Sequence, residues 1–401
     1  MAHLRTPLYL VSCTLYLHPM KQLPKLDHML RRLIGIPSVS SVSPEFDMGN
    51  RGVIDELAGW CESAGFAVEV TPIDGNPDKA NLVATLGKGP GGLVLSGHTD
   101  TVPCDPELWS QDPFRLTERD GRLYGLGTTD MKSFLALALE AARSFDPADF
   151  QQPLVLLATA DEESSMSGAR AIRAAGRPLG RQAVIGEPTG LRPVRMHKGI
   201  IMEGIRITGR SGHSSDPRLG NNALEGMHRA IGEILAWRDE LQARYNNPLF
   251  KVAVPTLNLG HIHGGDNPNR ICGHCEMHID LRPLPGMDLD ELREALNARL
   301  QRALGDTGLG LEVFRLFPGT PAMETPADAP LVRAAESLTG HAAEAVAFGT
   351  EGPYLRELDM DVVVLGPGDI DQAHQPDEYL SMDRIEPTLN LLRSLIRGFC
   401  L

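Results

Sequence analysis

The sequence predicts an α/β protein with a mostly parallel central sheet, interrupted by a smaller inserted α+β domain. Several apolar runs stop abruptly at turn residues, as strands buried on both faces of a parallel sheet do. The chain has 401 residues, more than the roughly 250–300 at which one hydrophobic core stops growing, so we expect two domains. Residues 198–317 show a different pattern, with alternating strands and helices in the order β-α-β-β-α-β.

The first part of the chain predicts two surface helices and two outer strands. Helical spacing covers residues 26–64 and is interrupted by a Ser/Pro-rich loop at 36–44. Residues 66–70 and 81–86 then alternate between apolar and polar, and a Pro/Gly/Asp turn region separates them. We expect these strands to be outer members of the sheet.

Four apolar runs, beginning at Leu93, Leu154, Ala183 and Val362, predict the central strands. Chemically active side chains follow them, namely His98, the triplet Asp161, Glu162 and Glu163, then Glu187 and His374. Ligands bind beyond the carboxyl ends of strands in open α/β sheets, so parallel neighbours would bring these groups together. Asp130 lies in a glycine-rich loop at the start of a predicted helix from Ser133. Taken alone, Asp130 is typical of a helix N-cap. The acidic triplet alone is typical of a charged loop, and Glu187 alone is typical of a turn.

The inserted segment resembles a split βαβ, ferredoxin-like sandwich. Its strands are expected at 200–209, 253–262, 271–281 and 309–316, and its helices at 222–241 and 289–304. We therefore divide the chain into a catalytic domain at 20–197 and 318–401 and an inserted domain at 198–317. The second catalytic part is expected to contain a helix near 331–338, the Val362 strand and a closing helix from Ile385.

Residues 1–19 are expected to be a non-native or disordered extension. The run Leu8–Leu17 resembles the apolar part of a signal peptide, but no small-x-small cleavage site follows it and it is too short to span a bilayer. Met20 is a natural start. We expect a cytoplasmic protein with no membrane partner.

Composition excludes some partners and cofactor types. The formal net charge of −14, without a block of Lys and Arg, would repel a phosphate backbone, so nucleic acid is not expected. Six cysteines are too few for a disulfide scaffold in so long a chain. Cys272 and Cys275 have the spacing of a redox or zinc pair, but three positions apart on a strand they would point to opposite faces. Simple packing is the favoured interpretation.

The clustered residues suit a metal-dependent hydrolase. The candidate ligands are His98, Asp130, Glu163, Glu187 and His374. Mixed imidazole and carboxylate donors suit Zn²⁺, Co²⁺ or Mn²⁺, and five of them suit two metals if one carboxylate bridges. Asp100 is placed to accept the second ring N–H of His98, and Glu162 is free to be the general base. Paired metals activate water and polarise a carbonyl, as amide hydrolysis requires.

The sequence resembles the M20 family of dinuclear zinc peptidases and deacylases. The motifs that carry the resemblance are Gly97–Pro103, Gly125–Lys132, Thr159–Glu163, Gly186–Thr189 and Ala373–Glu378. Those that are similar to its acetylornithine deacetylase branch are Ser211–Pro217, Pro255–Gly265, Asn269–Ile271 and Arg282–Met287. The resemblance extends over nearly the whole chain from Met20.

The resemblance implies a zinc-peptidase-like catalytic domain with two Zn²⁺ per subunit, for which Co²⁺ or Mn²⁺ are alternatives. In the family pattern His98 and Glu187 bind one zinc, Glu163 and His374 bind the other, and Asp130 bridges both. It also implies that Glu162 is the base and proton shuttle. The peptide after the bridging aspartate is often cis in relatives, which here is Asp130–Met131.

The resemblance further implies a homodimer formed through the inserted domain, which acts as a lid. His213 would cross the dimer to stabilise the oxyanion. Arg270, Asn258 and Thr350 would line the pocket of a small N-acyl amino acid, with the Arg270 guanidinium suited to its α-carboxylate. His261 and His263, two positions apart at the end of a predicted strand, could mimic a metal pair, but loop or substrate-side roles are favoured, and their roles are not assigned.

The expected substrate is N²-acetyl-L-ornithine, and N-acetylcitrulline and N-succinyl-diaminopimelate are the alternatives. A non-catalytic binding protein on the same fold is a further alternative, but it would be expected to lack Glu162 or a ligand.

Overall fold

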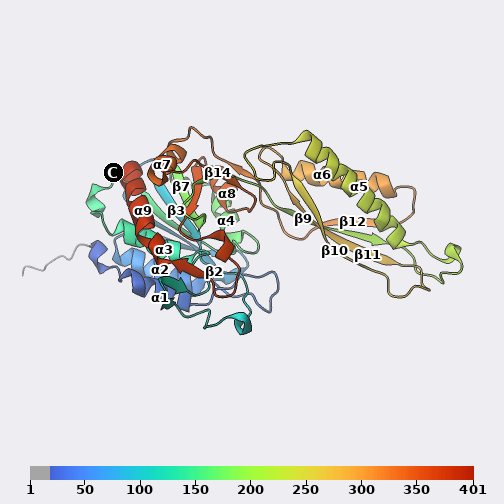
Figure 1. The fold of residues 1–401 in the computed structure, drawn as a ribbon, viewed down its shortest axis with the longest axis horizontal. Helices are drawn as coiled ribbons and strands as arrows, with labels where there is room; N and C mark the ends of the chain where they lie inside the picture. Colours follow the sequence, from blue (N-terminus) through green and yellow to red (C-terminus); the bar gives the residue numbers. More distant parts are fainter. Residues whose placement is uncertain (1–18) are drawn as a thin grey trace, which may run out of the picture.

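The protein forms two lobes in a computed structural model that describes residues 19–401 (Figure 1). The larger lobe contains a nine-stranded sheet between helices, and the smaller contains a four-stranded sheet with two helices on one face. Apart from Pro19, the extension expected at residues 1–19 lies outside the described residues. Among residues 19–401, no helix combines the length and the apolar character needed to cross a membrane.

The nine-stranded sheet is parallel at its centre and mostly antiparallel toward its edges, where only β14 pairs in parallel, with β8. Its order is β1-β2-β6-β3-β7-β15-β8-β13, and β14 pairs with β8. The central strands are β6 (Leu154–Thr159), β3 (Leu93–His98), β7 (Gln182–Pro188) and β15 (Asp361–Gly366), all mutually parallel. The outer strands toward the other edge are β8 (Val194–His197), β13 (Met323–Glu324) and β14 (Glu344–Val346). The four predicted apolar runs are therefore confirmed as parallel neighbours.

The first two strands form a hairpin that is longer than the sequence predicts. β1 (Ala67–Ile73) and β2 (Asn76–Leu86) are antiparallel, and only Asp74 and Gly75 separate them. Gly75 has a φ of +82°, a conformation that glycine adopts without strain. The expected turn region was too wide, because backbone pairing continues through polar residues that lie at the sheet edge.

Helices cover both faces of this sheet, as an α/β fold requires. One core cluster joins the sheet to α1 (Leu26–Gly35), α2 (Arg51–Ser63), α3 (Lys132–Ala142), α7 (Pro330–Thr339) and α9 (Ile385–Cys400). A second cluster joins its other face to α4 (Ser167–Ala175) and α8 (Gly352–Arg356). A small separate sheet, ordered β16-β5-β4, contains Tyr379–Ser381, Arg122–Tyr124 and Thr117–Arg119. It links the segment just before α9 to the loop that precedes α3.

The smaller lobe has the predicted β-α-β-β-α-β order. Its antiparallel sheet, ordered β10-β11-β9-β12, contains Thr256–Gly264, His274–Arg282, Ile201–Thr208 and Gly310–Arg315. The helices α5 (Ala223–Arg244) and α6 (Leu289–Leu304) share a buried core with one face of this sheet. Cys275 is buried in that core, and the buried Cys272 thiol donates a hydrogen bond to the carbonyl oxygen of His274. Both are free thiols, in agreement with simple packing.

Two chain crossings connect the lobes, and they run side by side. The backbones of Ile200 and Thr320 exchange two hydrogen bonds of 2.8 and 2.9 Å. The first crossing follows β8 and the second leads into β13, and these two strands are paired with each other. The proposed domain limits at 198 and 317 fall within these crossings, and they remain a prediction.

Candidate active site

The carboxyl ends of the central strands bring the predicted histidines and carboxylates together. His98 is the last residue of β3, the triplet 161–163 follows β6, Glu187 lies near the end of β7, and His374 follows β15. Asp130 reaches the same place from the loop before α3. Because the four strands are parallel neighbours, their ends meet at one edge of the sheet.

Asp130 lies between the two histidines. His98 Nε2 is 3.0 Å from Asp130 Oδ1, and His374 Nε2 is 3.4 Å from Asp130 Oδ2. His98 Nε2 is also 3.9 Å from Glu187 Oε1, and His374 Nε2 is 3.1 Å from Glu163 Oε1. The side chains thus form two groups that share Asp130, which is the pairing that the family resemblance implies. The Asp130–Met131 peptide bond is cis, as expected.

Negative charge accumulates at this site. Within residues 19–401, neither Lys nor Arg forms an ion pair with the four carboxylates of Asp130, Glu162, Glu163 and Glu187. Burial and the neighbouring carboxylates of Asp130 and Glu162 raise the pKa of Glu187 well above its usual value. Hydrogen bonds to Asp130 and Glu163 raise the pKa of His374 to about 10. Such an accumulation of carboxylates suits a divalent cation, whose charge would offset theirs.

The donor set fits a metal ion. Ligand atoms of His98, Asp130 and Glu163 all lie within 4.8 Å of one another, and so do those of His98, Glu162 and Glu187. Imidazole nitrogens with carboxylate oxygens, and no thiolate, suit Zn²⁺, Co²⁺ or Mn²⁺. Glu162 belongs to the second group, so its carboxylate can approach the same centre as the proposed ligands.

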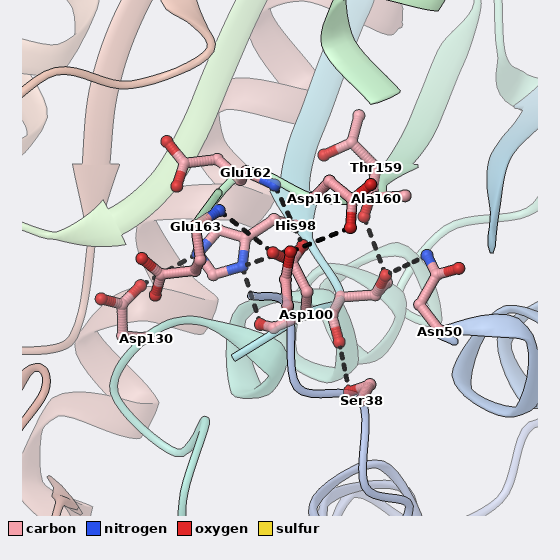
Figure 2. A network of polar contacts seen from close by, with 12 residues as sticks. Ser38, Asn50, His98, Asp100, Asp130, Thr159, Ala160, Asp161, Glu162 and Glu163 are labelled. Carbon is pink, nitrogen blue, oxygen red and sulfur yellow. Dashed lines mark hydrogen bonds and ion pairs between the residues drawn. The ribbon is translucent and has the colours of Figure 1, made fainter. Parts of the chain in front are cut away.

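Asp100 supports His98 with a different atom from the one expected. The ring Nδ1 of His98 is 2.9 Å from the backbone carbonyl oxygen of Asp100, whereas the Asp100 carboxylate is 3.7 Å away. The carboxylate instead accepts hydrogen bonds from the backbone N–H groups of Glu162 (3.2 Å) and Glu163 (3.0 Å), as Figure 2 shows. Asp100 therefore orients the imidazole through its main chain and fixes the 161–163 turn through its side chain.

A buried lysine, missed by the sequence analysis, also supports this turn. Asp161 has a φ of +58°, unusual for a residue with a side chain. Its carboxylate accepts hydrogen bonds from Lys79 Nζ (2.6 Å), Ser40 Oγ (2.9 Å) and Ser167 Oγ (2.7 Å). These contacts hold the turn in the conformation that presents Glu162 and Glu163. Lys79 gave no local signal, because it precedes Asp161 by 82 positions.

The predicted substrate residues do not gather at this centre within one chain. Arg270 and His213 form an isolated β-bridge in exposed segments, and Arg270 also pairs with Asp266 at 2.5 Å. The segment between β9 and α5, which contains His213, lies at the end of the smaller lobe remote from the nine-stranded sheet (Figure 1). Asn258 is exposed on β10. The structure therefore brings His213 and Arg270 together, but away from His98.

The remaining histidines of β10 lie on the smaller sheet. His261 is paired with His278 of β11, and their rings are 4.7 Å apart. His263 of β10 is paired with Glu276 of β11. These contacts place both histidines in the smaller lobe, away from the cluster around His98.

Thr350 is fully buried in the larger lobe beside a buried histidine. Its hydroxyl is 3.1 Å from His197 Nε2 and accepts a hydrogen bond from the N–H of Gly352. His197 Nδ1 is 2.8 Å from the carbonyl oxygen of Lys198, so Nδ1 is assigned as the protonated nitrogen and Nε2 as the acceptor from Thr350. The substrate role of Thr350 remains a prediction, since protein groups engage its hydroxyl here.

His197 predicts a loss of stability in acid. Burial lowers its pKa to about 4, whereas an unfolded histidine has a pKa of about 6.5. Between these values the unfolded chain binds the extra proton, so the free energy of unfolding falls as the pH is lowered from 6.5 to 4. The contribution lost is about 3 kcal/mol. We expect urea unfolding with a chelator present to show this loss between pH 7 and 4, relative to His197→Gln. Parallel pH profiles for the two proteins would contradict the assignment.

The α/β fold and this donor set together suit the class of metal-dependent hydrolases. Residues 94–398 match peptidase family M20/M25/M40. Over 379 residues the chain is 51% identical to a protein of Edwardsiella ictaluri (strain 93-146) named acetylornithine deacetylase, and the match covers 94% of this chain and 99% of the relative. The chain therefore belongs to peptidase family M20/M25/M40.

Solved structures of that family share the fold. An M20 family metallo-carboxypeptidase from Sulfolobus solfataricus gives a TM-score of 0.72 at 18% identity, covering 94% of this chain and 99% of the other. A dinuclear metal-binding M20 peptidase from Bacillus subtilis gives a TM-score of 0.63 at 15% identity, covering 93% and 97%. These similarities extend over both lobes.

Proposed function

We propose that the protein hydrolyses N²-acetyl-L-ornithine to L-ornithine and acetate, as a cytoplasmic enzyme of arginine biosynthesis. The observation that carries the proposal is the 51% identity, over 94% of the chain, to a protein named acetylornithine deacetylase. The cluster of two imidazoles and four carboxylates supports a hydrolytic reaction at the carboxyl edge of the sheet.

The proposed cofactors are two Zn²⁺ ions per subunit, with Co²⁺ or Mn²⁺ as substitutes. His98 and Glu187 would hold one ion, Glu163 and His374 the other, and Asp130 both. The distances of 3.0 and 3.4 Å from the two Asp130 oxygens to the two imidazoles support this division. When bound, such ions supply an acidified water and a polarised substrate carbonyl.

Glu162 is the proposed proton carrier of the reaction. Its carboxylate takes a proton from the attacking water and later gives that proton to the leaving amine nitrogen, so the acetyl C–N bond breaks to a neutral amine. Burial raises the pKa of Glu162 well above its usual value, as a group that must accept and return a proton requires. The hydrogen bond from its N–H to Asp100 holds the residue in place.

The proposed recognition of the substrate involves a second copy of the chain. Arg270 would pair with the α-carboxylate, Asn258 and Thr350 would bind polar groups of the substrate, and His213 would stabilise the oxyanion. The remote position of the His213 segment in one chain supports contributions across a homodimer formed through the smaller lobe (Figure 1).

The dimer proposal predicts complementation between two inactive variants. His213→Ala should lower kcat on the order of 10²-fold, as loss of an oxyanion donor does, with metal content unchanged. Mixing His213→Ala subunits with Glu162→Gln subunits should restore activity in the mixed dimers. In a mixed dimer, one of the two active sites has both Glu162 from one subunit and His213 from the other. Initial rates after exchange of subunits test this. A fully active monomer in sedimentation would contradict the role of His213.

The function is tested by initial rates on three substrates with one zinc-loaded preparation. We expect N²-acetyl-L-ornithine to be hydrolysed faster than N-acetylcitrulline and N-succinyl-diaminopimelate, and a chelator to abolish the reaction. Preference for another substrate would overturn the pocket assignment and keep the mechanism. No hydrolysis of any of the three would favour the non-catalytic alternative.

A further inference from the structure

The loop that carries Asp130 contacts one buried carboxylate, that of Glu378, through several backbone N–H groups. Glu378 Oε1 accepts hydrogen bonds from the backbone N–H groups of Thr129 (2.7 Å), Asp130 (3.0 Å) and Gly127 (3.1 Å). Its other oxygen, Oε2, is 3.1 Å from the same Gly127 N–H. Three converging N–H groups form a typical anion-binding concavity, and here a side chain of the protein occupies it.

No Lys or Arg among the described residues lies within ion-pair distance of Glu378, although the buried Lys132 is near enough to interact with it electrostatically. The exposed fraction of Glu378 is 1%. Burying a carboxylate is costly unless hydrogen bonds satisfy it. The hydrogen bonds to the loop therefore account for the position of this side chain, and they in turn fix the loop.

The backbone on both sides of this carboxylate joins the same loop. The carbonyl oxygen of Glu378 accepts a hydrogen bond from the N–H of Gly125 (3.0 Å), and that of Tyr379 accepts one from Thr129 Oγ1 (2.6 Å). Tyr379 is also paired with Tyr124 where β16 meets β5. The contacts thus cover the loop from 124 to 130.

The segment that contains Glu378 also contains His374, four residues earlier in the chain. The His374 side chain is 51% exposed, and its ring contacts Asp130 at 3.4 Å and Glu163 at 3.1 Å. The distance between His374 and Asp130 therefore depends on how residues 374–378 attach to the Asp130 loop. Glu378 makes that attachment at the backbone of Asp130 itself.

We propose that Glu378 is a positioning residue that sets the spacing between Asp130 and His374, and thereby the affinity of the site for its second metal ion. This inference rests on the proposed function, because it assumes that both residues are metal ligands. Glu378 is not itself one of the proposed metal ligands. It acts through the backbone N–H groups of the Asp130 loop, which donate hydrogen bonds to its carboxyl group.

Glu378→Gln tests the inference with little change in size. One of the two oxygens becomes an amide NH₂ group, so the Oε2 contact with the Gly127 N–H is lost, and a neutral amide oxygen takes the place of the carboxyl Oε1 that accepts from all three N–H groups. Loss of an outer partner of a metal ligand typically costs 10–100-fold in metal affinity. We expect the second Zn²⁺ to bind about 10–100-fold more weakly when the metal-free full chain is titrated by calorimetry. The KM for N²-acetyl-L-ornithine should stay near its native value while kcat falls at limiting zinc.

A matched control lies one residue away. Asp377 accepts hydrogen bonds from the N–H and Oγ of Ser110 at 2.8 and 3.0 Å, and it does not contact the Asp130 loop through its side chain. Asp377→Asn should leave both zinc affinities near the native values. Glu378→Asp keeps the carboxyl group but is shorter by one methylene, so we expect a smaller loss. It replaces Glu378→Gln if circular dichroism shows that Glu378→Gln does not fold.

The outcomes separate this inference from the proposed function. Equal affinity of the native chain and both Glu378 variants for the second Zn²⁺ would overturn the positioning role, whatever the substrate. The same loss in Asp377→Asn would also overturn it, because the effect would then belong to the whole segment. A native chain that binds two Zn²⁺ without hydrolysing N²-acetyl-L-ornithine would contradict the proposed function and leave the role of Glu378 standing.

Discussion

Replacing Glu162 by Gln is expected to lower kcat on N²-acetyl-L-ornithine by about 10²–10⁴-fold, the range that general acid–base catalysis contributes. The amide has nearly the shape of the carboxylate but cannot accept and return a proton. The N–H of residue 162 can still donate to Asp100, so the turn should keep its conformation. We therefore expect two metals per chain in this variant, measured by atomic emission after dialysis.

The neighbouring glutamate supplies the matched comparison. Glu163 Oε1 is 3.1 Å from His374 Nε2, so Glu163→Gln should weaken the metal on that side. Both variants should lose turnover, but only Glu163→Gln should also lose metal. Native turnover in Glu162→Gln would remove Glu162 as the base, and metal loss in that variant would indicate that it is a ligand.

The residues of the site that follow strand ends were predictable from the sequence. An apolar run that stops at a turn residue indicates both a central strand and the place where it ends, so His98, Glu163, Glu187 and His374 could be expected at one edge of the sheet. The order of the strands required the structure, because nothing local in the sequence shows which strands are neighbours. The β-α-β-β-α-β order of the smaller lobe was predictable for the same local reason.

The supporting contacts were not predictable in this way, and their physical basis explains why. Glu378 binds backbone N–H groups about 250 positions earlier, and every residue except proline offers the same donor. His98 is oriented by the Asp100 carbonyl oxygen, which every residue also has, so the sequence favoured the carboxylate instead. Pattern reasoning identifies side-chain chemistry, whereas these positioning contacts depend on where main-chain atoms lie.

Asp130→Asn is expected to lower the metal content from two ions per chain to one or fewer, and to lower kcat/KM by more than about 100-fold. Changes to the outer partners of a metal site alone cost about 10–100-fold, so losing Asp130, the proposed ligand of both ions, should cost more. Asp130 has one oxygen 3.0 Å from His98 and the other 3.4 Å from His374. An asparagine offers one acceptor oxygen, and its NH₂ group would face the second ion, so it can serve one side of the site only.

The pattern of loss distinguishes a bridge from an ordinary ligand. Glu187→Gln should weaken binding of the ion on the side of His98, and Glu163→Gln should weaken binding of the ion on the side of His374. Each variant should leave the other ion bound. Asp130→Asn should weaken the binding of both ions. A zinc titration of the metal-free chain would show this, because it resolves the two binding steps. The exposed Asp328→Asn should match the native chain in this titration. Two native affinities in Asp130→Asn would contradict the bridge, because a carboxylate shared by two cations cannot be replaced by a neutral amide without a cost to both.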